Sequence, residues 1–397
     1  MEDILSQGGD REPSPWPRRL AVLAVLVVVI VGGAVYLSLP HHQHAPVAAR
    51  RASVTASPAA APSLPPEPNG IAGPTLAWDR SLRLPVAGAQ PGWFSPASGR
   101  ADPIAGLPAD LSGYQFTRVV GGWAIQASPD PQAGCGSCAG PPSPVYFLAD
   151  GVRSVTRVGT ANLVAPSATA GAVWLTSYAL GASMTTAAGM AWESDAAGAL
   201  THPVTLPSGY AIDRGTDRGL LLTLVSPQQG AAAYKLWDPS SPLASQTFDG
   251  VLAASPGEIA WTPPCTPRCS VQMLDLATGR HTVVALPQGS SAASGAFSPD
   301  GDLLALQVSF SDVGDNGELA MQLEVAPVTG GRLTAVPDTF VSSNALVEFG
   351  WPSDGDSLVA EFIFTTKTQL ASWRPGASRP AVTVILPGPS QASLILG

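Results

Sequence analysis

Apolar and polar positions alternate in a way that predicts two strands and a tight turn between residues 295 and 310, "GAFSPDGDLLALQVSF". Pro299 presets φ near −65°, Asp300 can bond its own backbone, and Gly301 tolerates the left-handed conformation that closes such a turn. Residues 322–328 alternate again, and a short strand is expected at 333–336. The stretch therefore predicts a unit of four antiparallel strands.

The outer hairpin of this unit recurs along the chain. Six of its seven copies follow an apolar strand, which we expect to lie on the inner side of the unit. The copies are spaced by roughly 37 to 53 residues, the period of four-stranded propeller blades. We expect an all-β propeller, of seven four-stranded blades or alternatively six. The hairpins begin at Trp93, Val145, Met190, Tyr234, Val271, Leu323 and Leu370.

Closure of the ring needs strands from both ends of the domain. Seven blades are complete only if residues 81–88, 93–97 and 103–107 share a sheet with a fourth strand. The apolar segment "ASLILG" at residues 392–397 is the candidate, with Ser393 to Leu396 as the innermost strand. In a six-bladed ring the first hairpin would instead pack outside, where its exposed edges favour aggregation.

Two segments resemble a known repeat. "FSPDGDLLAL" at 297–306 and "GWPSDGDSLVAEF" at 350–362 are similar to the repeat of TolB-like, WD40-like β-propellers. Residues 265–281, "CTPRCSVQMLDLATGRH", resemble segments of membrane-anchored propeller proteins of actinobacteria. The resemblance implies a fold; it names no ligand, because propellers include both binding modules and enzymes.

The N-terminal region differs from the propeller. Residues 20–39 carry no charge and, as a helix, would span the hydrocarbon layer of about 30 Å. Arg18 and Arg19 precede this segment directly, which favours a cytoplasmic tail at 1–19. Residues 40–75 are rich in Pro and Ala and predict a disordered linker. The propeller, 76–397, would then lie outside a bacterial plasma membrane.

Charge and cysteines narrow the class of partner. The net charge of −9 belongs entirely to the chain after residue 70, so we expect no nucleic-acid partner.

Two cysteine pairs each occupy a connection between the second and third strands of a blade: Cys135 with Cys138, and Cys265 with Cys269. Two short disulfides are expected outside the membrane; a four-thiolate zinc site is the alternative. We place the binding face at the end of the ring that carries these connections.

No catalytic motif stands out, and we expect no cofactor and no metal. The two histidines of the propeller, His202 and His281, fall on outermost strands, away from any nucleophile. Asp213, Glu348 and Arg118 fall on predicted innermost strands, where they could line the central channel. We therefore expect a binding or scaffold module for an envelope protein, peptide or glycan rather than an enzyme. A glycosidase-like envelope hydrolase using channel carboxylates is the alternative.

Overall fold

The chain forms a ring of β-sheets. The computed structural model describes residue 71 and residues 77–387, except for 87–90, 109–112, 128–137, 227–232, 242–244, 266–267, 314–317, 343–344, 353–354 and 365–366. All regular structure in this part of the chain consists of strands. Within it we find no helix of the length and hydropathy that crossing a bilayer demands. The predicted tail 1–19 and membrane helix 20–39 lie outside the described residues.

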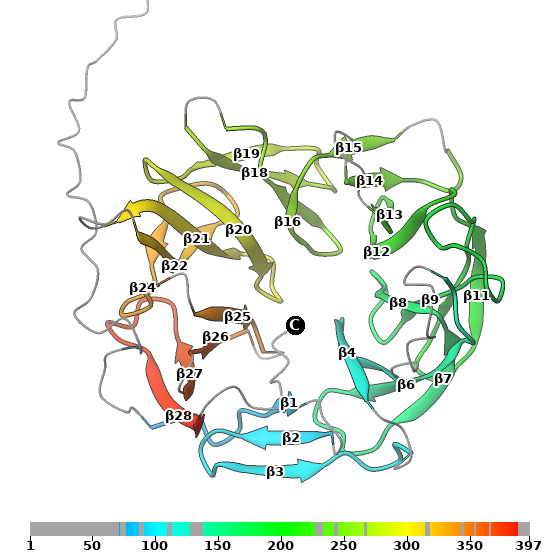
Figure 1. The fold of residues 1–397 in the computed structure, drawn as a ribbon, viewed down its shortest axis with the longest axis horizontal. Helices are drawn as coiled ribbons and strands as arrows, with labels where there is room; N and C mark the ends of the chain where they lie inside the picture. The colour runs from blue at the N-terminus through cyan, green and yellow to red at the C-terminus, as the bar shows by residue number, and fades with distance from the viewer. Residues whose placement is uncertain are drawn as a thin grey trace, which may run out of the picture. The chain divides into compact units, whose positions relative to one another are not determined.

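Seven sheets surround a central axis, so the prediction of a seven-bladed propeller is confirmed and the six-bladed alternative is wrong (Figure 1). Within each blade, antiparallel strands follow one another from the axis outward. Blade 1 comprises β4 (Tyr114–Val119), β5 (Gly122–Ala127), β6 (Ser143–Ala149) and β7 (Thr156–Ala161). Blade 2 comprises β8 (Leu163–Pro166), β9 (Val173–Ser177), β10 (Met190–Ser194) and β11 (Leu200–Thr205). Blade 3 comprises β12 (Tyr210–Thr216), β13 (Gly219–Leu224), β14 (Tyr234–Trp237) and β15 (Gln246–Phe248).

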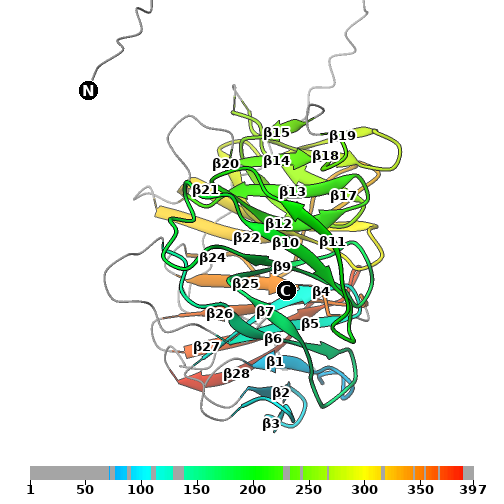
Figure 2. The ribbon, with the colours of Figure 1, turned by 90° about the vertical axis from the view of Figure 1, so that its right-hand side faces the viewer.

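The next three blades repeat this order, and Figure 2 shows the stacked sheets from the edge of the ring. Blade 4 comprises β16 (Val251–Ala254), β17 (Glu258–Trp261), β18 (Ser270–Asp275) and β19 (His281–Ala285). Blade 5 comprises β20 (Ser290–Phe297), β21 (Leu303–Val313), β22 (Glu318–Pro327), β23 (Thr334–Ala335) and β24 (Val341–Ser342), the last also paired with β22. Blade 6 comprises β25 (Leu346–Gly350), β26 (Leu358–Ile363), β27 (Lys367–Trp373) and β28 (Ala381–Pro387).

Blade 7 is made from the first strands of the propeller. It comprises β1 (Leu84–Val86), β2 (Gly92–Ser95) and β3 (Arg100–Pro103), in the order predicted from the sequence. The predicted innermost strand, Ser393 to Leu396, lies outside the described residues. Three strands of this blade are therefore described, and β1 stands at its inner edge.

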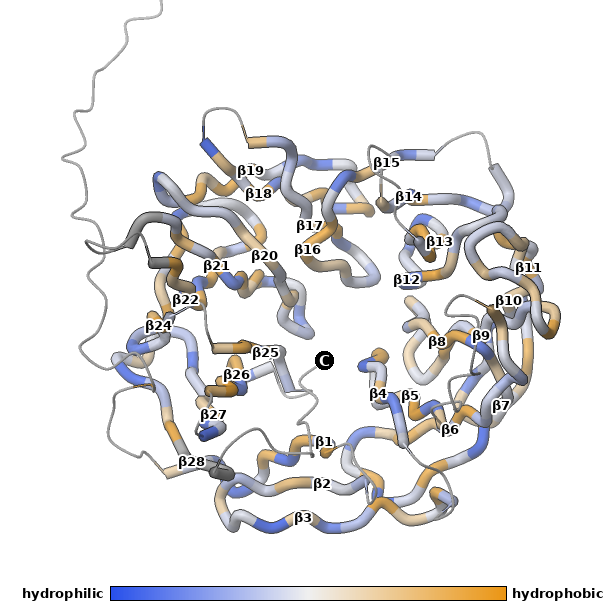
Figure 3. The backbone as a smooth tube through the Cα atoms, in the orientation of Figure 1, coloured by the Kyte–Doolittle hydropathy of each residue, from blue (hydrophilic) through white to orange (hydrophobic). Residues whose placement is uncertain are grey.

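The core is divided among the seven interfaces between blades. Each of seven buried apolar clusters joins two neighbouring blades, and hydrophobic stretches accordingly recur all round the ring (Figure 3). Trp93 packs blade 7 against blade 1, and Leu84 packs it against blade 6, so the first strands sit between the two ends of the series. Because every interface buries apolar side chains, the closed ring leaves no blade with an exposed apolar face.

Of the predicted disordered linker, 40–75, the structure describes only residue 71. Ile71 is buried among apolar residues of blades 5 and 6, and its backbone N–H donates to Gln369 Oε1 at 2.8 Å. Farther along, Trp78 is buried beside Leu82 and Val359. The sequence did not predict this contact, because a single apolar residue in a segment rich in Pro and Ala gives no periodic pattern.

Strand direction gives the ring two distinct faces. Because successive strands alternate in direction, the connections from second to third strands and those between blades share one face, the long-connection face. It carries the three longest connections within blades, residues 128–142, 178–189 and 225–233. The opposite, short-turn face carries the turns from first to second and from third to fourth strands. Among them is the predicted turn at 298–302, where Gly301 has φ of 77°.

Candidate binding surfaces

On the long-connection face, the connections of blades 1 and 2 are joined by backbone hydrogen bonds. Ala139 donates to the carbonyl of Ala182 at 2.9 Å and accepts from Gly181 at 2.9 Å. Asn162, between the two blades, donates from Nδ2 to Gly140 and accepts from the backbone of Tyr178, each at 2.8 Å. The described residues 138–142 and 178–189 of these connections therefore form one ordered surface, and a surface held in place loses less entropy on binding a partner.

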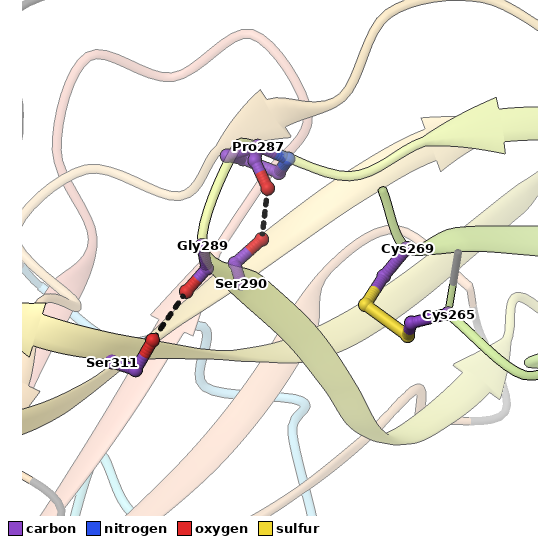
Figure 4. The surroundings of a disulfide bond; sticks show 6 residues. All are labelled: Cys265, Cys269, Pro287, Gly289, Ser290 and Ser311. Atoms are coloured by element: carbon purple, nitrogen blue, oxygen red, sulfur yellow. Dashed lines mark hydrogen bonds between the residues drawn. A yellow bond between two sulfur atoms is a disulfide. The ribbon is translucent and has the colours of Figure 1, made fainter. Parts of the chain in front are cut away.

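Cysteines add covalent links to this face. Cys265 and Cys269 form the expected disulfide, with Cα atoms 4.5 Å apart (Figure 4). Next to it, Ser290 Oγ donates to the carbonyl of Pro287 at 2.8 Å, and Ser311 Oγ donates to that of Gly289 at 3.1 Å (Figure 4).

The other predicted pair is described only in part. Cys138 takes part in a disulfide, whereas Cys135 lies outside the described residues. None of the described cysteines is free. Among the described residues no group of His, Cys, Asp and Glu side chains is arranged to hold a metal ion.

The short-turn face contains a cavity of about 420 Å³ where blade 7 meets blades 1 and 6. Arg118, at the end of β4, lies in its wall and donates to both carboxylate oxygens of Asp150, at 2.7 and 2.9 Å. The guanidinium also donates to the carbonyl of Gly122 at 2.9 Å and lies 5.1 Å from the ring centroid of Trp123. Arg118 thus holds the turns of blade 1 together beside the cavity.

The remaining wall of the cavity combines tryptophans with arginines. Trp93, Trp123 and Trp351 contribute buried rings, and Arg83 and Arg153 lie at exposed positions. Arg153 has one weak ion pair, 3.7 Å from Asp102. The carboxylates of Asp102 and Asp150 also lie in the wall, so the cavity combines apolar rings with charges of both signs. The sequence predicted a channel position for Arg118 but not this cavity, since its walls come from three blades.

The predicted channel carboxylates lie on innermost strands of different blades. Asp213 is on β12 of blade 3, Glu348 is on β25 of blade 6, and two blades separate them along the ring (Figure 1). Burial raises the pKa of Asp213, and the neighbouring Arg214 guanidinium partly offsets this effect. Glu348 instead faces Glu361 across β25 and β26, with Glu348 exposed and Glu361 buried. The structure thus does not place Asp213 and Glu348 on adjacent strands.

A carboxylate that the sequence analysis missed lies between blades 4 and 5. Glu258, the first residue of β17, is half-buried, and its Oε2 is buried without a hydrogen-bond partner among the described residues. Burial raises its pKa to about 7, assisted by the nearby charges of Asp275 and Asp302. Asp275 ends β18 opposite Glu258, whereas Asp302 comes from the next blade, so spacing along the chain gives no sign of the cluster.

The propeller histidines lie on outermost strands, as predicted. His281 is on β19 and His202 is on β11, where His202 Nδ1 lies 2.9 Å from Glu193 Oε2. The hydroxyl of Ser167 donates to the other oxygen of the same carboxylate. Because Glu193 stands between the serine and the histidine, His202 is not placed to take the serine proton, as a nucleophilic triad requires.

Comparison with known proteins assigns no family to the chain. No protein-family model matches the chain, and no curated protein is detectably similar to it. Among solved structures, a putative TolB from Agrobacterium tumefaciens shares 12% identity over 77% of this chain and 90% of its own, with a TM-score of 0.37. The β-propeller domain of the Trilobed protease from Pyrococcus furiosus shares 8% identity over 75% of this chain and 89% of its own length, with a TM-score of 0.47. A prolyl endopeptidase shares 10% identity over 78% of this chain and 47% of its own length, with a TM-score of 0.49.

Proposed function

We infer that this chain is an extracytoplasmic binding or scaffold module for an envelope protein, peptide or glycan. It is tethered to a bacterial plasma membrane by one helix at residues 20–39, with the N-terminus cytoplasmic. The uncharged length of that segment supports the tether. The bonded cysteines support an oxidising compartment, since disulfides persist outside the cytosol.

A single observation carries the binding role: on the long-connection face, backbone hydrogen bonds join residues 139 and 181–182 of neighbouring blades into one ordered surface. On the same face, a disulfide joins Cys265 to Cys269. Leu180, 71% exposed, projects from this ordered surface. Rigid loops bearing exposed apolar side chains are suited to contact a partner.

Proximity labelling in intact cells tests the binding role and its face together. Leu180→Asp should abolish labelling of the partner, because it places a charge in the apolar contact. Leu200→Asp is the matched control, since Leu200 is also exposed and lies in the same blade on the short-turn face. If Leu180→Asp labels the same proteins as the unaltered chain, the long-connection face is not the binding face.

Topology is tested separately. Protease added to cells whose outer wall has been opened should remove the propeller and leave residues 1–19 intact. Protection of the propeller with loss of the tail would show the reverse orientation.

The hydrolase alternative rests on a different observation. Burial raises the pKa of Asp213, the property that a general acid needs. In this case the protein should release reducing ends from purified cell-wall glycan, and Asp213→Asn should abolish the release. A binding module would release none before or after the substitution.

A further inference from the structure

Trp78 differs from three other tryptophans of the ring. Trp93, Trp351 and Trp373 each donate from Nε1 to a backbone carbonyl, at 3.3, 3.1 and 2.9 Å. Trp78 is only 8% exposed, yet its Nε1 is buried without a hydrogen-bond partner among the described residues. A buried N–H without an acceptor costs free energy, and such donors are therefore rare in folded proteins. Trp78 thus holds a donor that the described part of the chain does not use.

Trp78 forms part of the wall of a second cavity, of about 330 Å³, which we call the Trp78 cavity. Ser357 directly precedes β26 and Arg374 directly follows β27, so this cavity lies at the short-turn face of blade 6. It shares no lining residue with the cavity beside Arg118. It also lies on the face opposite the long-connection face, so it is independent of the proposed partner surface. Its polar lining consists of Trp78, Asp79, Ser357, Ser372, Arg374 and Arg379.

The floor of the Trp78 cavity is the side of blade 6 that faces blade 7. Ser372 of β27 pairs with Val359 of β26 and with Ala381 of β28, so these three side chains lie in one row across the sheet. Val359 and Ala381 pack in the apolar cluster that joins blade 6 to blade 7, and Trp78 belongs to the same cluster. Ser357, 7% exposed, is a second buried polar residue of the wall. Among the described residues neither serine hydroxyl forms a hydrogen bond, so both can donate to a ligand.

The lining of the Trp78 cavity has an excess of positive charge. Its one acid among the described residues is Asp79, whose Oδ1 accepts from the N–H and the hydroxyl of Ser81, at 2.8 and 2.6 Å. The other oxygen, Oδ2, accepts from Arg374 Nη2 at 3.1 Å, so Arg374 offsets the charge of Asp79. Arg379 is exposed and forms no hydrogen bond or ion pair within the described part of the chain. The cavity therefore keeps one positive charge without a counter-charge.

We propose that the Trp78 cavity binds a phosphate group. The guanidinium of Arg379 supplies the counter-charge, and the hydroxyls of Ser357 and Ser372 and the indole N–H of Trp78 donate to the phosphate oxygens. A phosphate group has three strongly accepting oxygens, whereas a carboxylate has two, so phosphate suits a wall rich in donors. Binding gives the Trp78 N–H the acceptor that the described residues do not provide. The group is either free phosphate or a phosphate ester of a larger molecule.

Calorimetric titration of the full-length chain with inorganic phosphate, glycerol phosphate and acetate tests the proposal. Inorganic phosphate should bind about tenfold or more tightly than acetate, and Arg379→Gln should weaken phosphate binding by about the same factor, because the anion loses its counter-charge. Arg332→Gln is the matched control and should bind phosphate as the unaltered chain does. Arg332 is also exposed, and it lies between the third and fourth strands of blade 5, as Arg379 does in blade 6. Glycerol phosphate distinguishes the two sources: binding as tight as that of the free ion indicates an ester, and much weaker binding indicates free phosphate.

Trp78→Phe separates binding from packing, because it keeps an aromatic ring and removes the N–H. Phosphate should raise the melting temperature of the unaltered chain and should raise that of Trp78→Phe much less. A residue that only packs would change the melting temperature without phosphate and leave the phosphate-induced rise intact. Acetate binding as tight as that of phosphate, no phosphate binding by the unaltered chain, or equal phosphate affinity in Arg379→Gln would overturn the proposal. An equal phosphate-induced rise in Trp78→Phe would overturn it as well.

Discussion

Glu258 should make the stability of the propeller depend on pH near neutrality. Its pKa lies at about 7 rather than 4.5, since burial and the charges of Asp275 and Asp302 disfavour the carboxylate. The folded protein therefore holds a proton that the unfolded chain releases near pH 4.5. It follows that stability decreases as the pH rises from about 4.5 through 7. Glu258→Gln keeps a neutral side chain of the same shape and should remove this decrease.

The magnitude follows from the two pKa values. At about 1.4 kcal/mol per pKa unit, the difference between 4.5 and about 7 corresponds to about 3.4 kcal/mol at most. Glu258 is only half-buried, so solvent screening reduces this to roughly 1–2 kcal/mol. In a domain of this size, such a change moves the melting temperature by roughly 1–3 °C.

Thermal unfolding followed by circular dichroism between pH 5 and pH 8 measures the effect. The Glu258→Gln variant should melt close to the unaltered protein at pH 5 and roughly 1–3 °C above it at pH 8. Glu348→Gln is the control, because it removes an exposed carboxylate of the same type. A difference between Glu258→Gln and the unaltered protein that stays constant from pH 5 to pH 8 would refute the reasoning.

Three further substitutions test other parts of the fold. Replacing Cys265 and Cys269 by serine should lower stability by no more than about 2 kcal/mol, since the enclosed loop is short; melting with and without reductant measures this, and a larger loss would contradict it. Asp150→Asn leaves its arginine partner without a counter-charge and should lower the unfolding free energy in urea by about 1–3 kcal/mol, whereas an unchanged midpoint would contradict the pairing. Gly122→Ala places a Cβ 2.4 Å from a backbone carbonyl oxygen and should lower that free energy by about 2–4 kcal/mol, while Gly140→Ala, with open space around the Cβ, should change it little.

The repeat of strands was predictable because it rests on local chemistry. The turn at Pro299 to Gly301 follows from the backbone preferences of those residues, and alternating apolar positions beside it specify the strands. The same pattern gave seven hairpins and favoured seven blades, with six as the alternative that only the structure excluded. The disulfide of Cys265 with Cys269 was predictable because the two cysteines share one short connection and an oxidising compartment favours disulfides.

Only the tertiary structure brought together the groups of the candidate sites. The cavity takes Arg83 from blade 7 and Arg118 from blade 1, and the cluster around Glu258 takes Asp302 from the next blade. Local sequence patterns report each strand's own environment, whereas these contacts depend on how neighbouring blades pack around the ring. For the same reason the sequence placed Asp213 and Glu348 on innermost strands but did not show that two blades separate them. The closed ring, rather than any single repeat, therefore decides which charges meet.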